Sequence, residues 1–260
     1  NRRMSEIEII IPDWDVPAEI IAGVSTRAGG ASRHPYDSLN LAHHVGDSAA
    51  RVNKNLRLLS NRYPQHLRWQ WLRQTHGSNV HRADACCGPV TADGICTSVP
   101  ELACCVLTAD CMPVLFAARD GGEVALAHVG WRGLVAGILE RTISRCNTPA
   151  QELVAWLGPA IGPCHFKVGA EVKAAFLAIA GDLEEREALQ KYFKATAEPG
   201  KYLCDLYGIA RFKLTQSGIA RIYGGQYCTF CEPELFYSYR RDDVTGRMAS
   251  FIYIRKPHQK

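Results

Sequence analysis

Short runs of apolar residues, separated by turn signals, form the main hydrophobic pattern of the chain. Such runs are typical of strands that are buried in a sheet. They predict strands at residues 103–108, 114–118, 123–127, 153–157 and 248–254. Apolar positions at helical spacing predict amphipathic helices at residues 133–146, 172–179 and 203–214.

Strands and helices follow one another without a strict alternation of β and α elements. This order favours an α+β protein in which a large mixed sheet is flanked by helices. Because no Gly/Ser-rich or Pro-rich linker divides the sequence and no internal repeat is visible, we expect a single domain over residues 1–260. We interpret residues 1–3, ahead of Met4, as a remnant or as residues upstream of an internal start.

Composition narrows the class of protein. With 260 residues, of which 47% are hydrophobic and 22% charged, the chain matches globular proteins rather than disordered or fibrous ones. The net charge of +4 is weak and no basic run occurs, so we expect no nucleic-acid partner. No apolar stretch approaches the roughly 18–20 residues of a membrane helix, so we expect no membrane association.

The cysteines point to a reduced compartment. There are eleven of them, an odd number, and they include the vicinal pairs Cys86-Cys87 and Cys104-Cys105. Neighbouring cysteines rarely bridge each other, and the chain is too long for a small disulfide scaffold. We therefore expect a reduced, cytoplasmic protein.

Side chains that can bind a metal gather in three segments at the ends of predicted strands. His76 lies in the first segment, Cys111 follows the strand at 103–108, and His128 follows the strand at 123–127. Two imidazoles and one thiolate are a familiar ligand set for zinc, and three protein ligands leave a fourth position for water or substrate. Spacing alone leaves a second interpretation open, in which the histidines are hydrogen-bonded within the fold and Cys111 is a small buried hydrophobe.

These segments resemble the signature of the YfiH-like family, which is also labelled the laccase-domain or polyphenol oxidase family. The matching segments are Gln74-Thr75-His76-Gly77, Thr108-Ala109-Asp110-Cys111-Met112-Pro113 and His128-Val129-Gly130-Trp131-Arg132-Gly133. Matches run in order from about Val24 to Ile254. They include Ser25-Thr26-Arg27, Tyr36-Asp37-Ser38-Leu39-Asn40-Leu41, Phe236-Tyr237-Ser238-Tyr239-Arg240-Arg241-Asp242 and Thr245-Gly246-Arg247-Met248.

The resemblance implies a fold, an activity and a cofactor. The implied fold is a single-domain α/β sandwich, distantly like that of a bacterial cytotoxic necrotizing toxin. The implied activity is that of a purine nucleoside phosphorylase that uses phosphate to release the base of adenosine, inosine, guanosine or methylthioadenosine, together with adenosine deaminase activity. The resemblance also implies that His76, Cys111 and His128 bind a catalytic zinc ion, with copper as the alternative metal.

Deamination places two chemical demands on the site. It needs a nucleophilic water, whose pKa zinc lowers from about 16 towards 7, and a carboxylate that carries the proton. Asp110, next to Cys111, is the main candidate for this catalytic role; the alternative is that it caps a turn or orients a ligand histidine. Asp93 is a weaker candidate, because Asp-Gly is first of all a turn signal.

Phosphorolysis needs side chains that hold phosphate, a role for which the arginine fork is well suited. Four residues of the matched segments are the candidate substrate-binding residues: Arg27, Asn40, Arg132 and Arg241. For each arginine the alternative is a surface or interface ion pair. Leu56 stands where many relatives have arginine, so phosphorolysis here depends on whether Arg57 substitutes for it.

Two further pairs of residues that can bind a metal are weaker indications of a functional site. Cys228 and Cys231 form a Cys-x-x-Cys pair, which is half of a zinc knuckle. Because no second cysteine pair has matching spacing, the sequence favours two ordinary thiols. Cys164 and His165, which follow a Gly-Pro turn, are candidates for the mouth of the site.

Three other functions stay open. The older family label implies a copper phenol oxidase, but none of the nine histidines are two residues apart, so the chain lacks the His-x-His motifs of a multicopper laccase. A cysteine hydrolase, acting for example on a peptidoglycan precursor, could use Cys111 as nucleophile and His128 as base. A zinc-stabilised binding module is the third, although structural zinc usually has four protein ligands.

Overall fold

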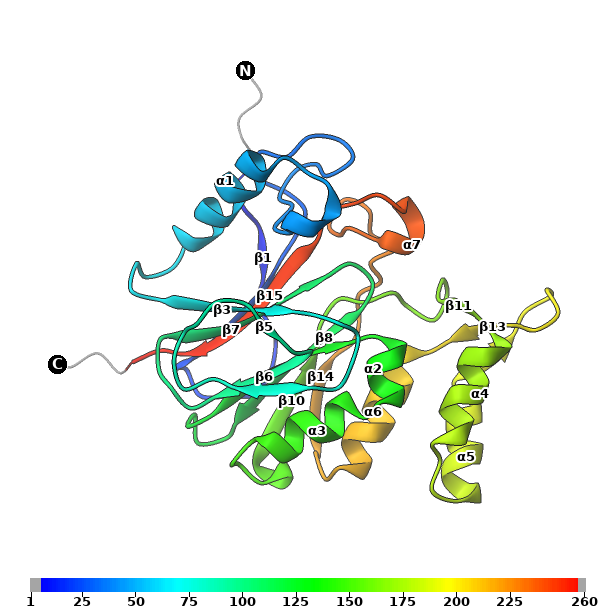
Figure 1. Cartoon of the computed structure of the whole chain (residues 1–260). Helices are drawn as coiled ribbons and strands as arrows, with labels where there is room; N and C mark the ends of the chain where they lie inside the picture. The colour runs from blue at the N-terminus through cyan, green and yellow to red at the C-terminus, as the bar shows by residue number, and fades with distance from the viewer. Residues whose placement is uncertain (1–5, 257–260) are drawn as a thin grey trace.

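A computed structural model describes residues 6–256, so residues 1–3, interpreted as a remnant or as upstream of a start, lie outside the described residues. Within residues 6–256 the strands form two six-stranded mixed sheets and one three-stranded sheet. The two large sheets pack face to face, and each has helices on its outer side (Figure 1). The result is a four-layer sandwich of helix, sheet, sheet and helices.

The first large sheet contains both ends of the described chain. In spatial order its strands are β1 (Ile9–Ile10), β2 (Ile20–Ser25), β15 (Met248–Ile254), β7 (Leu102–Thr108), β3 (Arg68–Arg73) and β5 (Val90–Thr91). The pairs from β1 to β7 are antiparallel, whereas β7 with β3 and β3 with β5 are parallel. The C-terminal strand β15 therefore lies at the centre of this sheet.

The second large sheet is built around two antiparallel hairpin strands, β8 and β9. In spatial order its strands are β14 (Arg221–Gly224), β10 (Leu153–Leu157), β8 (Met112–Ala118), β9 (Val124–Val129), β6 (Gly94–Thr97) and β4 (Val80–Arg82). The two outer pairs are parallel and the three inner pairs are antiparallel. The turn between β7 and β8 joins the two large sheets.

Helices cover both outer faces. The α-helices are α1 (Ala49–Ser60), α2 (Trp131–Val135), α3 (Ile138–Arg145), α4 (Ala170–Ala178), α5 (Leu183–Gln190), α6 (Leu206–Gln216) and α7 (Tyr239–Asp242), and the 3-10 helices are η1 (His43–Val45) and η2 (Ala150–Glu152). In Figure 1, α1 lies above the first sheet, and α2, α3 and α6 lie below the second. Helices α4 and α5 project to one side, next to the small sheet of β11 (Lys167–Gly169), β13 (Lys201–Cys204) and β12 (Phe193–Ala195).

The continuous apolar runs in the sequence have a direct structural cause, because the central strands are buried on both faces. Leu115 of β8 packs between the sheets in the same cluster as Ile252 of β15. The next residue along β8, Phe116, points to the opposite face and packs in the cluster that contains Leu139 of α3. Likewise Phe251 of β15 packs on the side covered by α1. Alternate residues of one strand thus belong to different layers of the core.

The predicted fold class is confirmed: the molecule is a mixed α/β protein with large mixed sheets flanked by helices. The five predicted strands correspond to β7, β8, β9, β10 and β15, with small shifts at their ends. The strands are divided between two large sheets, whereas the sequence predicted one. Burial on both faces explains the difference, because a doubly buried strand gives no indication of the sheet to which it belongs.

Two predicted helices were wrong in detail. The helix predicted at 133–146 is divided into α2 and α3, because Gly137 adopts a left-handed conformation with φ of 81° between them. The helix predicted at 203–214 begins later, because residues 201–204 form β13 and the Asp205 side chain caps the first turn of α6 by accepting a hydrogen bond from Gly208 N–H. The helix predicted at 172–179 corresponds to α4.

Two further properties concern the whole described range. None of the helices within residues 6–256 is both long and apolar enough to cross a bilayer. All eleven cysteines fall in this range, and each is a free thiol.

Candidate metal centre

His76, Cys111 and His128 come from three separate segments and meet in space. One nitrogen or sulfur atom of each side chain lies within 4.8 Å of the corresponding atoms of the other two. The two imidazole rings are 4.8 Å apart between centroids and nearly perpendicular. His128 is only 3% exposed, Cys111 is half-buried and His76 is exposed. The centre is therefore open to solvent on the His76 side.

Strand ends from both large sheets place these three ligands. His76 follows β3, Cys111 lies in the turn from β7 to β8, and His128 is near the end of β9, opposite Pro113 of β8. The backbone has positive φ at His76 (60°) and at the neighbour of Cys111, Asp110 (88°). Non-glycine residues rarely adopt this conformation, so the surrounding structure must hold both segments in place.

Asp93 is the carboxylate that organises the centre. It is fully buried at the start of β6, and its Oδ1 lies 2.8 Å from His128 Nδ1. The same carboxylate accepts hydrogen bonds from the backbone N–H groups of Thr75, His76 and Gly77 at 2.8–3.1 Å. One side chain therefore fixes the ring of His128 and the backbone that carries His76. This arrangement also leaves His128 Nε2 as the nitrogen available to a metal.

The charges in the centre favour a thiolate at Cys111 and a protonated imidazole at His128, which a metal ion would have to deprotonate in order to bind. Burial alone raises the pKa of the Cys111 thiol, but the His128 and His76 imidazoles lower it to about 6. Burial lowers the pKa of His128, but the Cys111 thiolate and the Asp93 carboxylate raise it to about 9. Burial opposes ionisation of Asp93 as well, yet its hydrogen bonds from His128, Gly77 and Thr75 hold its pKa well below the usual range. A thiolate at Cys111 is the state that a metal needs.

Gly130 makes room for the sulfur and one imidazole. A Cβ atom at this position would lie 3.0 Å from Cys111 Sγ and 3.5 Å from His76 Cδ2. Gly130 is also the residue that precedes α2, where its extended backbone changes the chain from β9 into the helix. The absence of a side chain here thus allows the strand end to approach both ligands closely.

Asp110, expected to carry a proton or to hold a turn, makes two structural hydrogen bonds. Its Oδ1 accepts from the Thr229 hydroxyl at 2.6 Å, and its Oδ2 accepts from the backbone N–H of Arg240 at 2.7 Å. Its backbone carbonyl accepts from Ile161 N–H at 3.0 Å. These contacts join the Cys111 turn to the 229–240 segment.

Three of the four candidate substrate-binding residues are engaged in holding loops. Arg27 donates to the carbonyls of Asp37 and Pro233. Arg241 donates to the carbonyls of Thr229, Phe230 and Phe236 and pairs with Asp242. Asn40 is fully buried, and its amide bonds with Ala42, Asp47 and the backbone N–H of Arg247.

Two other arginines lie in matched segments of the chain. Arg132 is exposed in the first turn of α2, four residues after His128, with its guanidinium 4.6 Å from the Trp131 ring centroid. Arg247 was in a matched segment but was not a candidate. The Arg247 guanidinium donates to the carbonyls of Thr245 and Gly246 at 3.0 and 2.9 Å; burial lowers its pKa, and the charges of Cys111 and Asp110 oppose that effect.

Leu56, which stands where many relatives have arginine, lies on α1. Leu56 packs against the apolar cluster on the outer face of the first sheet, whereas the following residue, Arg57, is exposed. Asn55, the residue before them, is fully buried and holds the loop that contains Ser32, Ser38 and Asn40. Leu56 is therefore a partly buried residue that packs against the core.

The donor set fits a metal ion of the zinc or copper class. Two imidazoles and a thiolate are ligands that both metals accept. The hydrogen bond from Asp93 to His128 is the carboxylate–histidine arrangement that commonly orients a metal-bound imidazole. With three protein ligands and an exposed His76, the centre has an open position, as in catalytic sites.

The chain is similar in sequence to a known protein family and to named bacterial proteins. The family model described as "Multi-copper polyphenol oxidoreductase laccase" matches residues 21–255. The chain is 45% identical over 246 residues to "Purine nucleoside phosphorylase PA4543" of Pseudomonas aeruginosa, with 95% of this chain and 98% of that protein covered. It is 44% identical over 250 residues to "Purine nucleoside phosphorylase YfiH" of Escherichia coli K12, with 95% and 99% covered.

Solved structures of similar chains have the same fold. The crystal structure of Neisseria meningitidis protein NMB0706 is 40% identical, with a TM-score of 0.88 and coverage of 95% of this chain and 99% of that one. The crystal structure of YlmD from Geobacillus stearothermophilus is 32% identical, with a TM-score of 0.83 and coverage of 92% and 93%. On the family match and these identities, the chain belongs to the multi-copper polyphenol oxidoreductase laccase family, the family of the YfiH-type proteins.

Proposed function

We propose that this chain is a zinc-dependent purine nucleoside phosphorylase that also deaminates adenosine. The observation that carries the proposal is the convergence of His76, Cys111 and His128 on one accessible centre. It is supported by relatives of 44–45% identity, which are named purine nucleoside phosphorylases. The proposed substrates are phosphate and a purine nucleoside such as adenosine, inosine, guanosine or methylthioadenosine, which gives the free base and a ribose-1-phosphate type of product.

We propose zinc as the metal, because the histidines that lie close together are too few for a multicopper centre. Within residues 6–256, no group of closely spaced metal-capable side chains contains more than two histidines, whereas a multicopper centre needs many. Held by His76, Cys111 and His128, zinc would supply a Lewis acid and lower the pKa of water towards neutrality. The protein's own contribution is to orient the ligands: Asp93 holds His128 by its Nδ1 and sets the backbone of His76.

Asp110 has a positioning role in this proposal. It holds the Cys111 turn against Thr229 and Arg240, so its removal should shift the ligand rather than remove a proton carrier. We expect Asp110→Asn to lower kcat while leaving the shape of the pH–rate profile unchanged. If the variant instead loses one limb of that profile, Asp110 carries the proton in deamination, as the sequence first indicated.

Phosphate is proposed to bind at Arg132, an exposed arginine four residues after His128, and at Arg247, whose charge interacts with those of Cys111 and Asp110. Loss of one charged hydrogen bond costs about 1.5–3 kcal/mol, so Arg132→Ala should raise the KM for phosphate at least about tenfold. Arg119→Ala, an exposed arginine that follows the end of β8 opposite to Cys111, is the matched control and should leave this KM unchanged. An unaltered phosphate KM in Arg132→Ala would exclude Arg132 from the phosphate site.

Product analysis tests the proposed activity itself. The zinc-loaded chain is incubated with adenosine, with and without phosphate, and the products are separated. We expect adenine and ribose-1-phosphate only when phosphate is present, and inosine in either case. Cys111→Ala should abolish both reactions, and Cys86→Ala, which alters an exposed cysteine outside the centre, should retain them. No turnover of any purine nucleoside would refute the proposal.

A cysteine hydrolase is the second candidate, because Cys111, His128 and Asp93 are connected in the order nucleophile, base and orienting acid. For this activity Cys111 must react as a free thiolate. Hydrolytic activity that persists after chelation, with covalent labelling of Cys111 by a substrate analogue, would favour it. Activity lost with the metal would favour the phosphorylase.

A further inference from the structure

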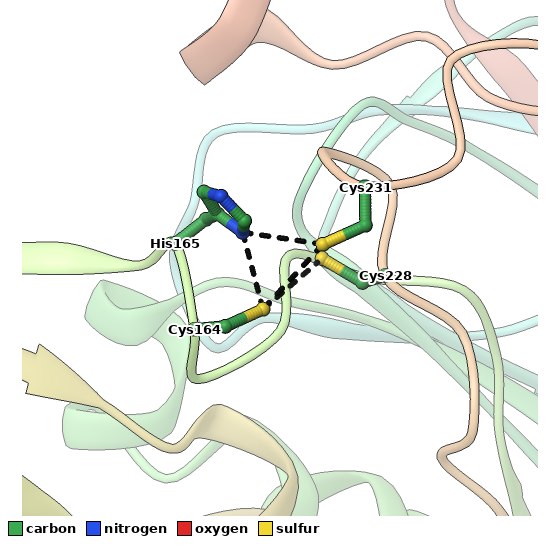
Figure 2. A group of neighbouring side chains, drawn as sticks. All are labelled: Cys164, His165, Cys228 and Cys231. Atoms are coloured by element: carbon green, nitrogen blue, oxygen red, sulfur yellow. Dashed lines mark hydrogen bonds between the residues drawn. The ribbon is translucent and has the colours of Figure 1, made fainter.

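A second cluster of metal-capable side chains lies outside the centre described above. It consists of Cys164 and His165, in the loop between β10 and β11, and Cys228 and Cys231, between β14 and α7. One ligand atom of each residue lies within 4.8 Å of those of the other three. Figure 2 shows the three sulfurs and the imidazole pointing towards one another from two facing loops.

We infer that these four side chains form a second, structural metal site that binds one zinc ion. Three thiolates and one imidazole are a complete ligand set for structural zinc. This set has no place for substrate, in contrast to the three-ligand centre. The sequence favoured ordinary thiols for Cys228 and Cys231, because the partners that complete the set come from a distant loop and are not a second Cys-x-x-Cys pair.

The distances fit a tetrahedron. Cys164 Sγ lies 4.0 Å from Cys228 Sγ and 3.5 Å from Cys231 Sγ. His165 Nδ1 lies 3.1 Å from Cys164 Sγ and 3.2 Å from Cys231 Sγ. Zinc bonds of about 2.3 Å to sulfur and about 2.0 Å to nitrogen imply S···S edges of about 3.8 Å and S···N edges of about 3.5 Å. The ligands are therefore already arranged at nearly the spacing that zinc requires.

The surroundings orient these ligands. Gly162 N–H donates to Cys228 Sγ at 3.2 Å, and the N–H groups of Phe230 and Cys231 also hydrogen-bond this sulfur. Such donors stabilise a thiolate. The Phe230 ring stacks on His165, with centroids 4.1 Å apart, and directs the imidazole towards the sulfurs. A Cβ at Gly162 would lie 3.1 Å from Cys228 Sγ, so a glycine is needed to bring the two loops this close.

A third group of metal-capable residues provides a contrast. Cys96, Glu123 and Cys146 also lie close together, but the Glu123 carboxylate already accepts hydrogen bonds from Arg82 at 2.7 Å and from the N–H groups of Asn147 and Thr148. A cation would have to compete with the guanidinium there. In the Cys164 cluster the contacts among the ligand atoms are thiol and imidazole contacts that metal binding replaces.

The site would connect distant parts of the chain. Between Cys228 and Cys231 lies Thr229, whose hydroxyl bonds with Asp110, the neighbour of Cys111. Arg241 donates to the carbonyls of Thr229 and Phe230. A metal that closes the chain between residues 164 and 231 therefore holds the segment that positions the Cys111 turn. This role is independent of the reaction that the other centre performs.

Metal content tests the inference in the full-length chain. The protein is expressed with the Cys111→Ala substitution, which removes a ligand of the other centre, and zinc per chain is measured after gel filtration. We expect about one zinc ion per chain in this background and close to none when Cys231→Ser is added. Cys86→Ser, an exposed cysteine outside both clusters, is the matched control and should leave the zinc content unchanged. Zinc content unaffected by Cys231→Ser would overturn the inference.

A second measurement needs no substitution in the cluster. The folded chain is treated with iodoacetamide, with and without prior zinc removal, and each cysteine is followed by mass spectrometry. We expect Cys164, Cys228 and Cys231 to be protected at least about tenfold by zinc, while Cys86 and Cys87 react at the same rate in both samples. Equal labelling of the three cysteines with and without zinc, or a metal-free disulfide between Cys164 and Cys231, would contradict a metal site.

Discussion

At the scale of single residues, the candidate metal centre depends on two residues, Asp93 and Gly130, that are not themselves candidate ligands. Asp93 accepts hydrogen bonds from His128 Nδ1 and from the backbone N–H groups of Thr75, His76 and Gly77. Gly130 leaves the space that Cys111 and His76 occupy. Because both residues fix where the ligand atoms lie, the main effect of a substitution at either position should be a change in the affinity for the metal.

Asp93→Asn tests this positioning role. The amide keeps the size of the side chain but removes the charge and presents a donor to N–H groups, so we expect zinc affinity to fall about 10–100-fold. Affinity is measured by competition with a chromophoric chelator. Asp84→Asn, an exposed carboxylate outside the centre, is the control and should keep the wild-type affinity. Equal affinities for Asp93→Asn and the wild type would mean that the hydrogen bond to His128 does not support the centre.

Gly130→Ala tests whether the space beside Cys111 is needed. The new methyl group would lie 3.0 Å from Cys111 Sγ, so the sulfur must move, and we expect weaker zinc binding together with a loss of turnover. Gly88→Ala is a matched control, because a Cβ at Gly88 meets nothing within 4 Å. If Gly130→Ala binds zinc and turns over like Gly88→Ala, the close approach has no functional role.

At the scale of elements, a buried ion pair connects the edge of the second sheet to the loop after α3. Glu123, just before β9, accepts from Arg82 of β4 at 2.7 Å and from the N–H groups of Asn147 and Thr148. Burial alone raises the pKa of Glu123, but the hydrogen bonds from Arg82, Asn147 and Thr148 lower it below its usual value. Its ionised form therefore stabilises the folded protein above the unfolded pKa of about 4.3, and this contribution is lost as the pH falls through the lower folded pKa.

Glu123→Gln should reveal that contribution. Because charged hydrogen bonds are replaced by neutral ones, we expect the free energy of unfolding at pH 7 to fall by about 2 kcal/mol. The difference from the wild type should shrink as the pH falls below the unfolded pKa of about 4.3 and through the lower folded pKa of Glu123. Urea unfolding at both pH values provides the measurement. A difference that stays constant with pH would show that the charge of Glu123 does not contribute.

At the scale of the whole molecule, the sequence predicted the strands better than their arrangement. The run 114–118 is apolar at every position because β8 is buried on both faces, which identifies a strand but not the sheet it joins. Cys111 and His128 became candidates because both can bind a metal at a predicted strand end and because their segments resemble the signature of the YfiH-like family. Asp93 was underestimated because Asp-Gly is also a turn signal, and the Cys164 cluster was missed because its two halves meet only in the folded chain.

His76, Cys111 and His128 are proposed to hold the zinc on which the proposed phosphorolysis depends. The most direct measurement is phosphorolysis of adenosine by the metal-free chain as zinc is added back, followed in parallel for the wild type and Cys111→Ala. We predict that the wild type regains activity as zinc is added and that Cys111→Ala stays inactive at every zinc concentration. Full activity in the metal-free wild type, or zinc-restored activity in Cys111→Ala, would contradict the claim.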